Sequence, residues 1–130
     1  MLDNHSFENV IFVFGSNRQG RHGKGAALKA MEYGAVYGQP EGLQGNAYAI
    51  ITKELRKYWP KVTLDEVAAG VTRFLSFAGH HPTWAFTVSP IGCGLAGFSP
   101  KEIAPMFRFR PENVLLPWEF RAELLDANSG

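Results

Sequence analysis

A glycine-rich stretch at residues 14–27 carries the side chains of this chain that are best suited to chemistry. Asn17, Arg21, His22 and Lys24 stand between its glycines, and the stretch directly follows a continuously apolar run. Glycine lets the backbone approach a ligand closely, and the free amides at the start of a following helix attract negative charge. An apolar strand, a glycine-rich turn and a helix in this order predict a site for an anionic, nucleotide-like ligand.

A second glycine-rich segment, residues 90–98, follows the strand expected at residues 83–88. Consecutive amides in such a segment can form an anion-binding concavity. The carboxyl ends of parallel strands share one edge of a sheet, and ligands bind beyond that edge. We therefore expect the two glycine-rich segments to meet there.

The motifs exclude two common nucleotide sites. A phosphate-binding loop of the NTPase kind needs Ser or Thr after Gly23-Lys24, and Gly25 stands there instead. The spacing of the glycines also fails to match the dinucleotide-binding fingerprint. Adjacent His80 and His81 look like a metal pair, but they have no third ligand spaced nearby, so no metal is expected.

Several polar residues allow both a chemical and a structural interpretation. His22 is suited to acid–base work or phosphate binding near neutral pH, or it hydrogen-bonds the loop backbone. Arg21 and Lys24 either pair with phosphate or lie in solvent. Cys93 could be an activated nucleophile, but no activating base is evident, which favours a small residue fitted between glycines.

The rest of the pattern predicts an α/β fold. Strands are expected at residues 10–14, 47–52, 83–88 and 113–116, with helices at 24–33, 63–79, from 99 and at 118–127, and a long loop at 35–46. Thr63 with Glu66 and Ser99 with Glu102 have the spacing of capping boxes. This alternation predicts a three-layer α/β/α architecture with a mainly parallel sheet of four strands.

Size and composition set outer bounds on function. The 130 residues fit one domain, residues 1–130, and a net charge of +1 predicts neither nucleic acid nor a membrane surface as partner. A single cysteine suits a reducing cytoplasm. The first five residues do not form a secretory signal, so we expect a cytoplasmic protein.

The glycine-rich segments resemble a known family. Residues 13–17, 20–27 and 91–98, together with 34–38 and 42–45, are similar to macrodomains, and more closely to the compact macrodomain-like proteins of bacteria and phages. The resemblance extends over about residues 9 to 117. It implies a compact macrodomain-like fold with a pocket for ADP-ribose or a derivative.

The resemblance also implies roles for individual residues. Asn17 matches the asparagine that holds the distal ribose, and the second segment matches the loop that wraps the diphosphate. The residues expected to bind the ligand are Gly15, Ser16, Gly20, Arg21, Gly23, Lys24, Gly25 and Ala26 in the first segment, Gln44 and Thr52 in the middle of the chain, and Ile91, Gly92, Cys93, Gly94, Leu95, Ala96, Gly97 and Phe98 in the second.

Two functions follow as hypotheses. In the first, the protein hydrolyses a bond at the distal ribose, either to a terminal phosphate or to an ADP-ribosylated protein. Asn17 would orient the ribose, and His22 or the substrate's own phosphate would manage protons. In the second, the protein is a reader or scavenger of ADP-ribose-type nucleotides and performs no chemistry, because no carboxylate stands in either segment. Neither hypothesis requires a cofactor.

Overall fold

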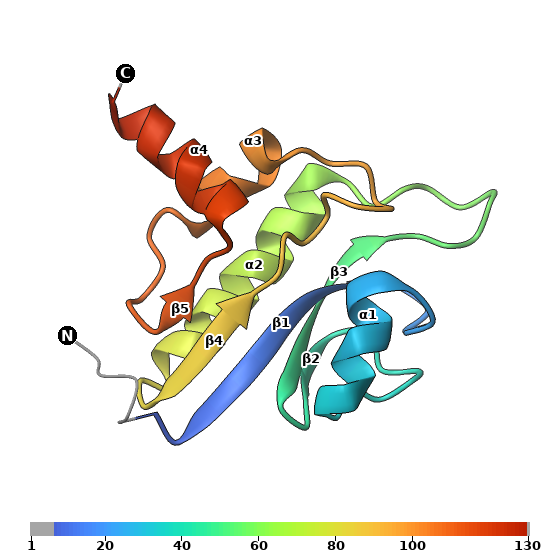
Figure 1. Cartoon of the computed structure of the whole chain (residues 1–130). Helices are drawn as coiled ribbons and strands as arrows, with labels where there is room; N and C mark the ends of the chain where they lie inside the picture. Colours follow the sequence, from blue (N-terminus) through green and yellow to red (C-terminus); the bar gives the residue numbers. More distant parts are fainter. Residues whose placement is uncertain (1–6, 130) are drawn as a thin grey trace.

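The computed structural model describes residues 7–129, with the side chains of residues 7–125. The predicted lack of a secretory signal concerns residues outside that range. Figure 1 shows a central sheet with helices on both faces. The elements in chain order are β1 (Asn9–Asn17), α1 (Gly25–Ala30), η2 (Met31–Tyr33), β2 (Gly42–Gln44), β3 (Ala47–Lys53), α2 (Leu64–Gly79), β4 (Trp84–Val88), α3 (Pro100–Ile103), η3 (Ala104–Phe107), β5 (Val114–Leu115) and α4 (Trp118–Ser129).

The sheet has the strand order β2-β3-β1-β4-β5. β1 pairs in parallel with β3 and β4, and β4 pairs in parallel with β5. Only β2 runs antiparallel, against β3. The α/β class and the mainly parallel sheet are therefore confirmed.

The prediction of four strands and a continuous loop at residues 35–46 was wrong, because β2 forms within that loop. β2 and β3 are joined by the two residues Gly45 and Asn46, and Gly45 has a φ of +59°. Gly-Asn between two short strands is a hairpin signal that the sequence contained. The strand is only three residues long, which hid it in a glycine-rich stretch.

Side-chain alternation along β1 divides the core into two layers. Ile11 and Val13 belong to a large cluster that also contains Val71 and Phe74 of α2. Residues of α3, η3 and α4 pack into the same cluster, so these helices cover the same face as α2. On the other face, Phe14 packs against small residues, including the buried alanines of α1. A helix layer on each face gives the predicted three-layer arrangement (Figure 1).

The predicted helix starts are confirmed. Thr63 caps α2 and Ser99 caps α3, each in a reciprocal capping box with the glutamate three residues later. Pro105 cannot donate a backbone hydrogen bond, and the chain changes there from α3 to the 3-10 helix η3. The caps define where α2 begins after the connection from β3, and where α3 begins after the segment that follows β4.

Candidate functional site

A cavity of about 860 Å³ lies at the carboxyl ends of β1, β3 and β4. The chain leaves β1 toward β3 on one side and later crosses to β4 on the other side. Such a reversal of direction leaves a crevice at the carboxyl edge of the sheet, where α/β proteins bind ligands. The volume is within the range of small-molecule and cofactor sites.

Two segments form most of the cavity, and we name them by position: the first wall is residues 15–27 and the second wall is residues 90–98. Most residues predicted to bind a ligand do line the cavity. They are Gly15, Ser16, Asn17, Arg21, Gly23, Lys24, Gly25, Ala26, Thr52, Ile91, Gly92, Cys93, Gly94, Leu95 and Ala96. The predicted residues that do not line it are Gly20, His22, Gln44, Gly97 and Phe98.

The floor of the cavity is the end of β1, which runs three residues beyond the predicted strand. A register shift between Ser16 and Asn17 interrupts the pairing with β3 there, a type of irregularity that often occurs beside sites. Thr52 Oγ1 donates a hydrogen bond of 3.2 Å to the Ser16 carbonyl. A Cβ at Gly15 would lie 3.1 Å from Thr52 Oγ1 and 3.5 Å from the Gly92 nitrogen. Glycine at position 15 therefore lets the second wall approach the sheet.

The side chain of Asn17 is engaged with the backbone of its own wall. Its Nδ2 donates to the Arg21 carbonyl at 2.8 Å, and its Oδ1 accepts from the Arg21 amide at 2.9 Å. This pair of bonds closes the turn after β1. Asn17 lines the cavity, but its side chain first of all fixes the shape of the first wall.

The geometry gives no support to the predicted catalytic role of His22. Its side chain is 0% exposed and does not line the cavity. Nε2 lies 3.1 Å from the Gln39 carbonyl oxygen and 3.3 Å from Gln44 Oε1, so this nitrogen carries a proton and donates it to these acceptors. Nδ1 is buried and has no partner among the described residues. The interpretation that His22 ties loop backbone together fits this position.

The amide side chain of Gln44, in β2, also ties loop backbone together. Its Oε1 also accepts from the Val36 amide at 2.8 Å, while its Nε2 donates to the Gln39 carbonyl at 2.8 Å. Gln44 is 3% exposed and lies behind the first wall. Gln44 was predicted in the ligand site, but it does not line the cavity and instead supports the first wall.

Gly20 was also placed in the ligand site, but it packs against backbone. Its φ is +68°, and a Cβ there would lie 2.6 Å from the Gly38 carbonyl carbon. The Gly38 amide donates to the Gly20 carbonyl at 2.7 Å. The residue is glycine because the segment around residue 38 passes directly over it.

The second wall is held mainly by its own backbone. The Phe98 amide donates to the Gly92 carbonyl at 2.8 Å, and the Gly97 amide donates to the Gly94 carbonyl at 3.1 Å. The Phe98 ring lies beside Gly92, where a Cβ would be 3.2 Å from Phe98 Cδ2. Gly97 and Phe98 therefore close the turn and do not line the cavity, unlike the other residues predicted in this segment.

Cys93 is not an activated nucleophile in this structure. Burial raises the pKa of its thiol, and the negative charges of Glu119 and Glu102 raise it further. Its Sγ lies 3.4 Å from the Ile91 carbonyl oxygen, to which it donates. The preferred interpretation, a small residue fitted between glycines, agrees with this environment.

The cavity also contains residues that were not in the predicted set. Ser89 directly precedes the second wall, Pro90 is its first residue and Lys53 follows Thr52, so strand ends could have indicated these three. Ala27 is the last residue of the first wall, and Pro100 follows the second wall closely. Tyr37, Leu55 and Glu119 come from segments distant in sequence, for which no comparable signal was available.

Charge is unevenly distributed around the cavity. Arg21, Lys24 and Lys53 line it, and Glu119, in the first turn of α4, is the acidic residue among the described lining side chains. None of these three cations lies within 4.0 Å of a carboxylate of the described residues. They are therefore available to an anionic ligand.

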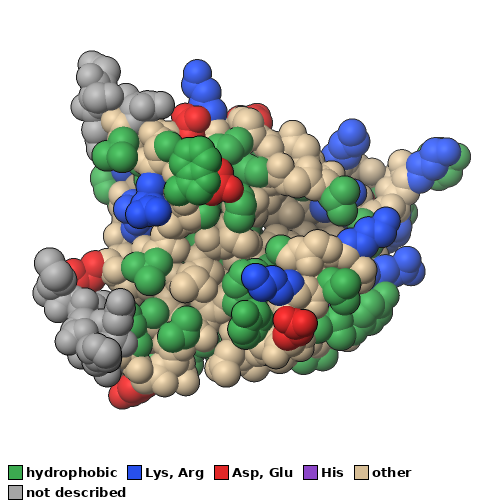
Figure 2. Space-filling model, in the orientation of Figure 1, with side chains coloured by type: hydrophobic (Ala, Val, Ile, Leu, Met, Phe, Trp, Pro, Cys, Tyr) green, Lys and Arg blue, Asp and Glu red, His purple; other side chains and the backbone are tan. Residues whose placement is uncertain are grey.

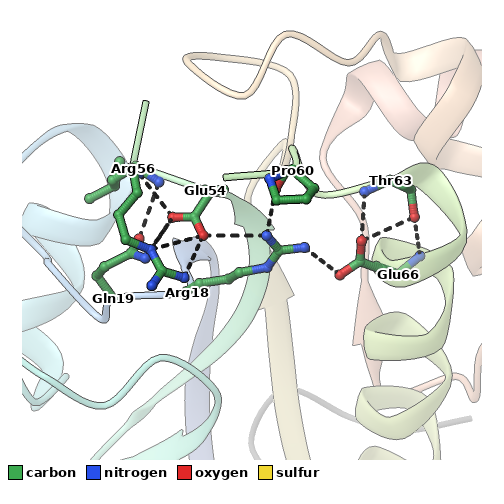
Figure 3. A network of polar contacts seen from close by, with 8 residues as sticks. Arg18, Gln19, Glu54, Arg56, Pro60, Thr63 and Glu66 are labelled. Carbon is green, nitrogen blue, oxygen red and sulfur yellow. Dashed lines mark hydrogen bonds and ion pairs between the residues drawn. The ribbon is translucent and has the colours of Figure 1, made fainter. Parts of the chain in front are cut away.

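A polar network joins the first wall to the β3–α2 connection (Figure 3). Arg18 donates to Glu54 at 3.4 Å, to Glu66 at 2.7 Å and to the Pro60 carbonyl at 2.6 Å. Hydrogen bonds from Arg56 first of all, and also from Gln19 and Arg18, lower the pKa of Glu54 to about 2. The Glu54 carboxylate is thus held ionised beside the cavity by side chains from both segments.

The described residues contain no group of three or more His, Cys, Asp or Glu side chains that could hold a metal ion. No helix among them is long and apolar enough to cross a membrane.

Comparison with known proteins supports the fold. No family model and no curated protein matches this chain. Among solved structures, a protein of unknown function from Bacteroides thetaiotaomicron is similar, with a TM-score of 0.58 and 17% sequence identity. The match covers 83% of this chain and 86% of that chain. At this level of identity the likeness concerns the fold alone.

Proposed function

We propose that this protein binds ADP-ribose or a closely related NAD-derived nucleotide in the cavity between its two walls. One observation carries the proposal: glycine-rich segments that follow the adjacent parallel strands β1 and β4 close on one cavity of about 860 Å³. The choice of ADP-ribose among nucleotides comes from the resemblance of these segments to macrodomains. The solved structure of similar fold does not bear on the ligand.

The charges fit an anionic ligand that spans the cavity. We place the diphosphate near the second wall, where small residues let the backbone approach it, and within reach of Arg21, Lys24 and Lys53. Tyr37 and Leu55 supply apolar surface suited to a base or ribose face. The expected partner is thus a small molecule, or an ADP-ribosyl group carried on a larger one.

Binding without chemistry is the function that the geometry favours. Each of the three side chains considered for chemistry has another engagement: Asn17 with the Arg21 backbone, His22 in the interior, and Cys93 as a thiol of raised pKa. We therefore propose a reader or scavenger of ADP-ribose-type nucleotides.

Hydrolysis at the distal ribose is the second candidate, and one observation favours it. Glu119 places a carboxylate on the cavity, where it could accept a proton from a water that attacks a phosphate or an ADP-ribosyl ester. No feature of the sequence pointed to Glu119, because it lies outside both glycine-rich segments.

Calorimetric titration with ADP-ribose, NAD, ADP and AMP tests the binding proposal. Gly94 lines the cavity, does not have a positive φ and has open space where a Cβ would stand. Gly94→Gln should therefore fold normally, fill the cavity and weaken ADP-ribose binding at least about tenfold, or 1.4 kcal/mol. Gly79→Gln, at the end of α2 and equally unobstructed, is the matched control and should bind as wild type. Absence of heat with all four nucleotides would refute the proposal.

Turnover separates the two candidates. ADP-ribose phosphorylated on its distal ribose and a mono-ADP-ribosylated protein are incubated with wild type and with Glu119→Gln. A binding protein leaves both substrates at the uncatalysed rate. Turnover that Glu119→Gln abolishes, with nucleotide affinity kept, would establish hydrolysis instead.

A further inference from the structure

The connection between β3 and α2 carries the most prominent exposed aromatic residues beside the cavity. We call residues 54–61 the arm. Tyr58 is 90% exposed and Trp59 is 56% exposed. The Arg56 guanidinium lies 3.7 Å from the centre of the Trp59 ring, and Lys57 Nζ lies 5.6 Å from that of Tyr58. Planar rings paired with cations are thus presented to the exterior. The backbone of the arm projects from the body of the molecule in Figure 1.

Hydrogen bonds hold the arm in place, and its first residues lie beside the cavity. Arg18 binds Glu54 at the base of the arm and the Pro60 carbonyl beyond its tip, and also Glu66 in α2 (Figure 3). The Glu54 side chain is 1% exposed within this network. Leu55, next to Glu54, lines the cavity. The arm that carries Tyr58 and Trp59 therefore begins at the rim of the cavity.

The surface around the arm is rich in cations. Figure 2 shows Lys and Arg side chains gathered toward the right of the molecule, where the arm projects in the same view. Lys57 and Lys61 on the arm, like the three cations of the cavity, have no carboxylate within 4.0 Å among the described residues. The net charge of +1 predicted no nucleic-acid partner, but net charge averages over the whole surface and conceals this local excess.

We propose that the arm binds single-stranded nucleic acid, and that the strand leads out of the cavity between the two walls. Bases stack on exposed aromatic rings while lysines and arginines follow the phosphates, and the arm offers both within a few residues. An acidic peptide would use the cations and leave the two rings without a matching partner. Only one part of this inference rests on the proposed function, namely the identity of the group in the cavity. That group would be a nucleotide carried on the nucleic-acid strand.

Fluorescence anisotropy with labelled oligothymidylate and oligoadenylate of about twelve nucleotides tests the arm directly. Tyr58→Ala and Trp59→Ala should each weaken binding at least about fivefold, since a stacked base contributes at least about that factor. Lys57→Gln should lower the slope of log affinity against log salt by about one. The matched control is Phe109→Ala: Phe109 is 91% exposed between Arg108 and Arg110, and none of the three lines the cavity.

The outcomes separate this inference from the proposed function. Strand binding that depends on Tyr58 and Trp59 supports the arm, whether or not ADP-ribose binds. ADP-ribose binding without strand binding overturns the arm and leaves the proposed function intact. An equal loss in Phe109→Ala, or equal affinity for a polyglutamate peptide, also overturns it, since either result would show nonspecific attraction of anions.

Discussion

The two walls of the cavity are built by different means. The first wall is held by side chains: Asn17 binds the Arg21 backbone from within, and His22 with Gln44 ties it to residue 39 from behind. The second wall is held by bonds between its own backbone groups, from Gly92 to Phe98. One segment thus depends on particular side chains, and the other on a tight turn.

The difference changes how polar residues in a glycine-rich segment should be interpreted. A backbone that turns sharply leaves amides and carbonyls without partners, and these must be satisfied where they are buried. In the first wall, Asn17 and His22 supply those partners, so the two side chains best suited to chemistry are both engaged with neighbouring groups of the fold. Among the described charged side chains that line the cavity, Arg21, Lys24 and Lys53 remain as cations for a ligand and Glu119 as a carboxylate.

Substitution of Gly20 should break the first wall most severely. Gly20→Ala puts a Cβ within 3.0 Å of three backbone atoms, at a φ of +68°. Strained dihedrals and overpacking each cost about 1–3 kcal/mol, so we expect a loss of about 3 kcal/mol in the free energy of unfolding, measured in urea.

Gly23 is the matched control for that change. It lies in the same wall, and a Cβ there meets nothing within 4 Å. Gly23→Ala should change stability by less than about 0.5 kcal/mol. Equal losses in the two variants would show that the backbone contact at Gly20 does not hold the wall.

Replacement of His22 should destabilise the protein by about 2 kcal/mol without removing nucleotide binding. His22→Leu keeps an apolar volume against Phe14, but leaves the Gln39 carbonyl and Gln44 with one donor fewer. Chemical denaturation and calorimetry with ADP-ribose measure the two effects. A variant of unchanged stability that loses turnover would restore the catalytic interpretation and contradict the structural one.

The first wall should also make the stability of the protein depend on pH, through the hydrogen bonds that Arg18 and Gln19 donate to Glu54. We expect this effect to be smaller than those above. The folded pKa of Glu54 is about 2, below its ordinary value of 4.5. Between these values the unfolded state binds more protons, so the network's contribution is present above pH 4.5 and is lost as pH falls toward 2.

Glu54→Gln should therefore lower stability at pH 7 and flatten its decline in acid, measured by urea unfolding across this pH range. The arm should also become more accessible to proteases. Glu112→Gln, a glutamate for which the described residues show no ion pair, is the control and should follow the wild-type profile. An unchanged acid profile in Glu54→Gln would contradict the pKa assignment.

The sequence predicted the frame of the site better than its details. Apolar runs and capping boxes located the helices and most strands, and the position of both glycine-rich segments after strands predicted that they would share one edge. The end of β1 was missed because Gly15, Ser16 and Asn17 are not apolar, although they pair with β3. Burial of His22 could not be predicted, since Phe14, Tyr37 and Gln44 meet around it only in the fold.

The smallest expected effect concerns the second wall. The reactivity of the Cys93 thiol measures the environment there, and the turn is held by backbone bonds rather than by this side chain. Burial, and then the charges of Glu119 and Glu102, raise the pKa of the thiol, so its alkylation at pH 8 should be slower than that of free cysteine. Glu119→Gln should speed the reaction modestly by removing the larger of the two charge effects, while Glu32→Gln, in η2, should not change it. Bound ADP-ribose should slow it further, since Cys93 lines the cavity. A thiol that reacts faster than free cysteine would mean that the backbone of the second wall stabilises a thiolate, and the nucleophile hypothesis for Cys93 would then displace the structural one.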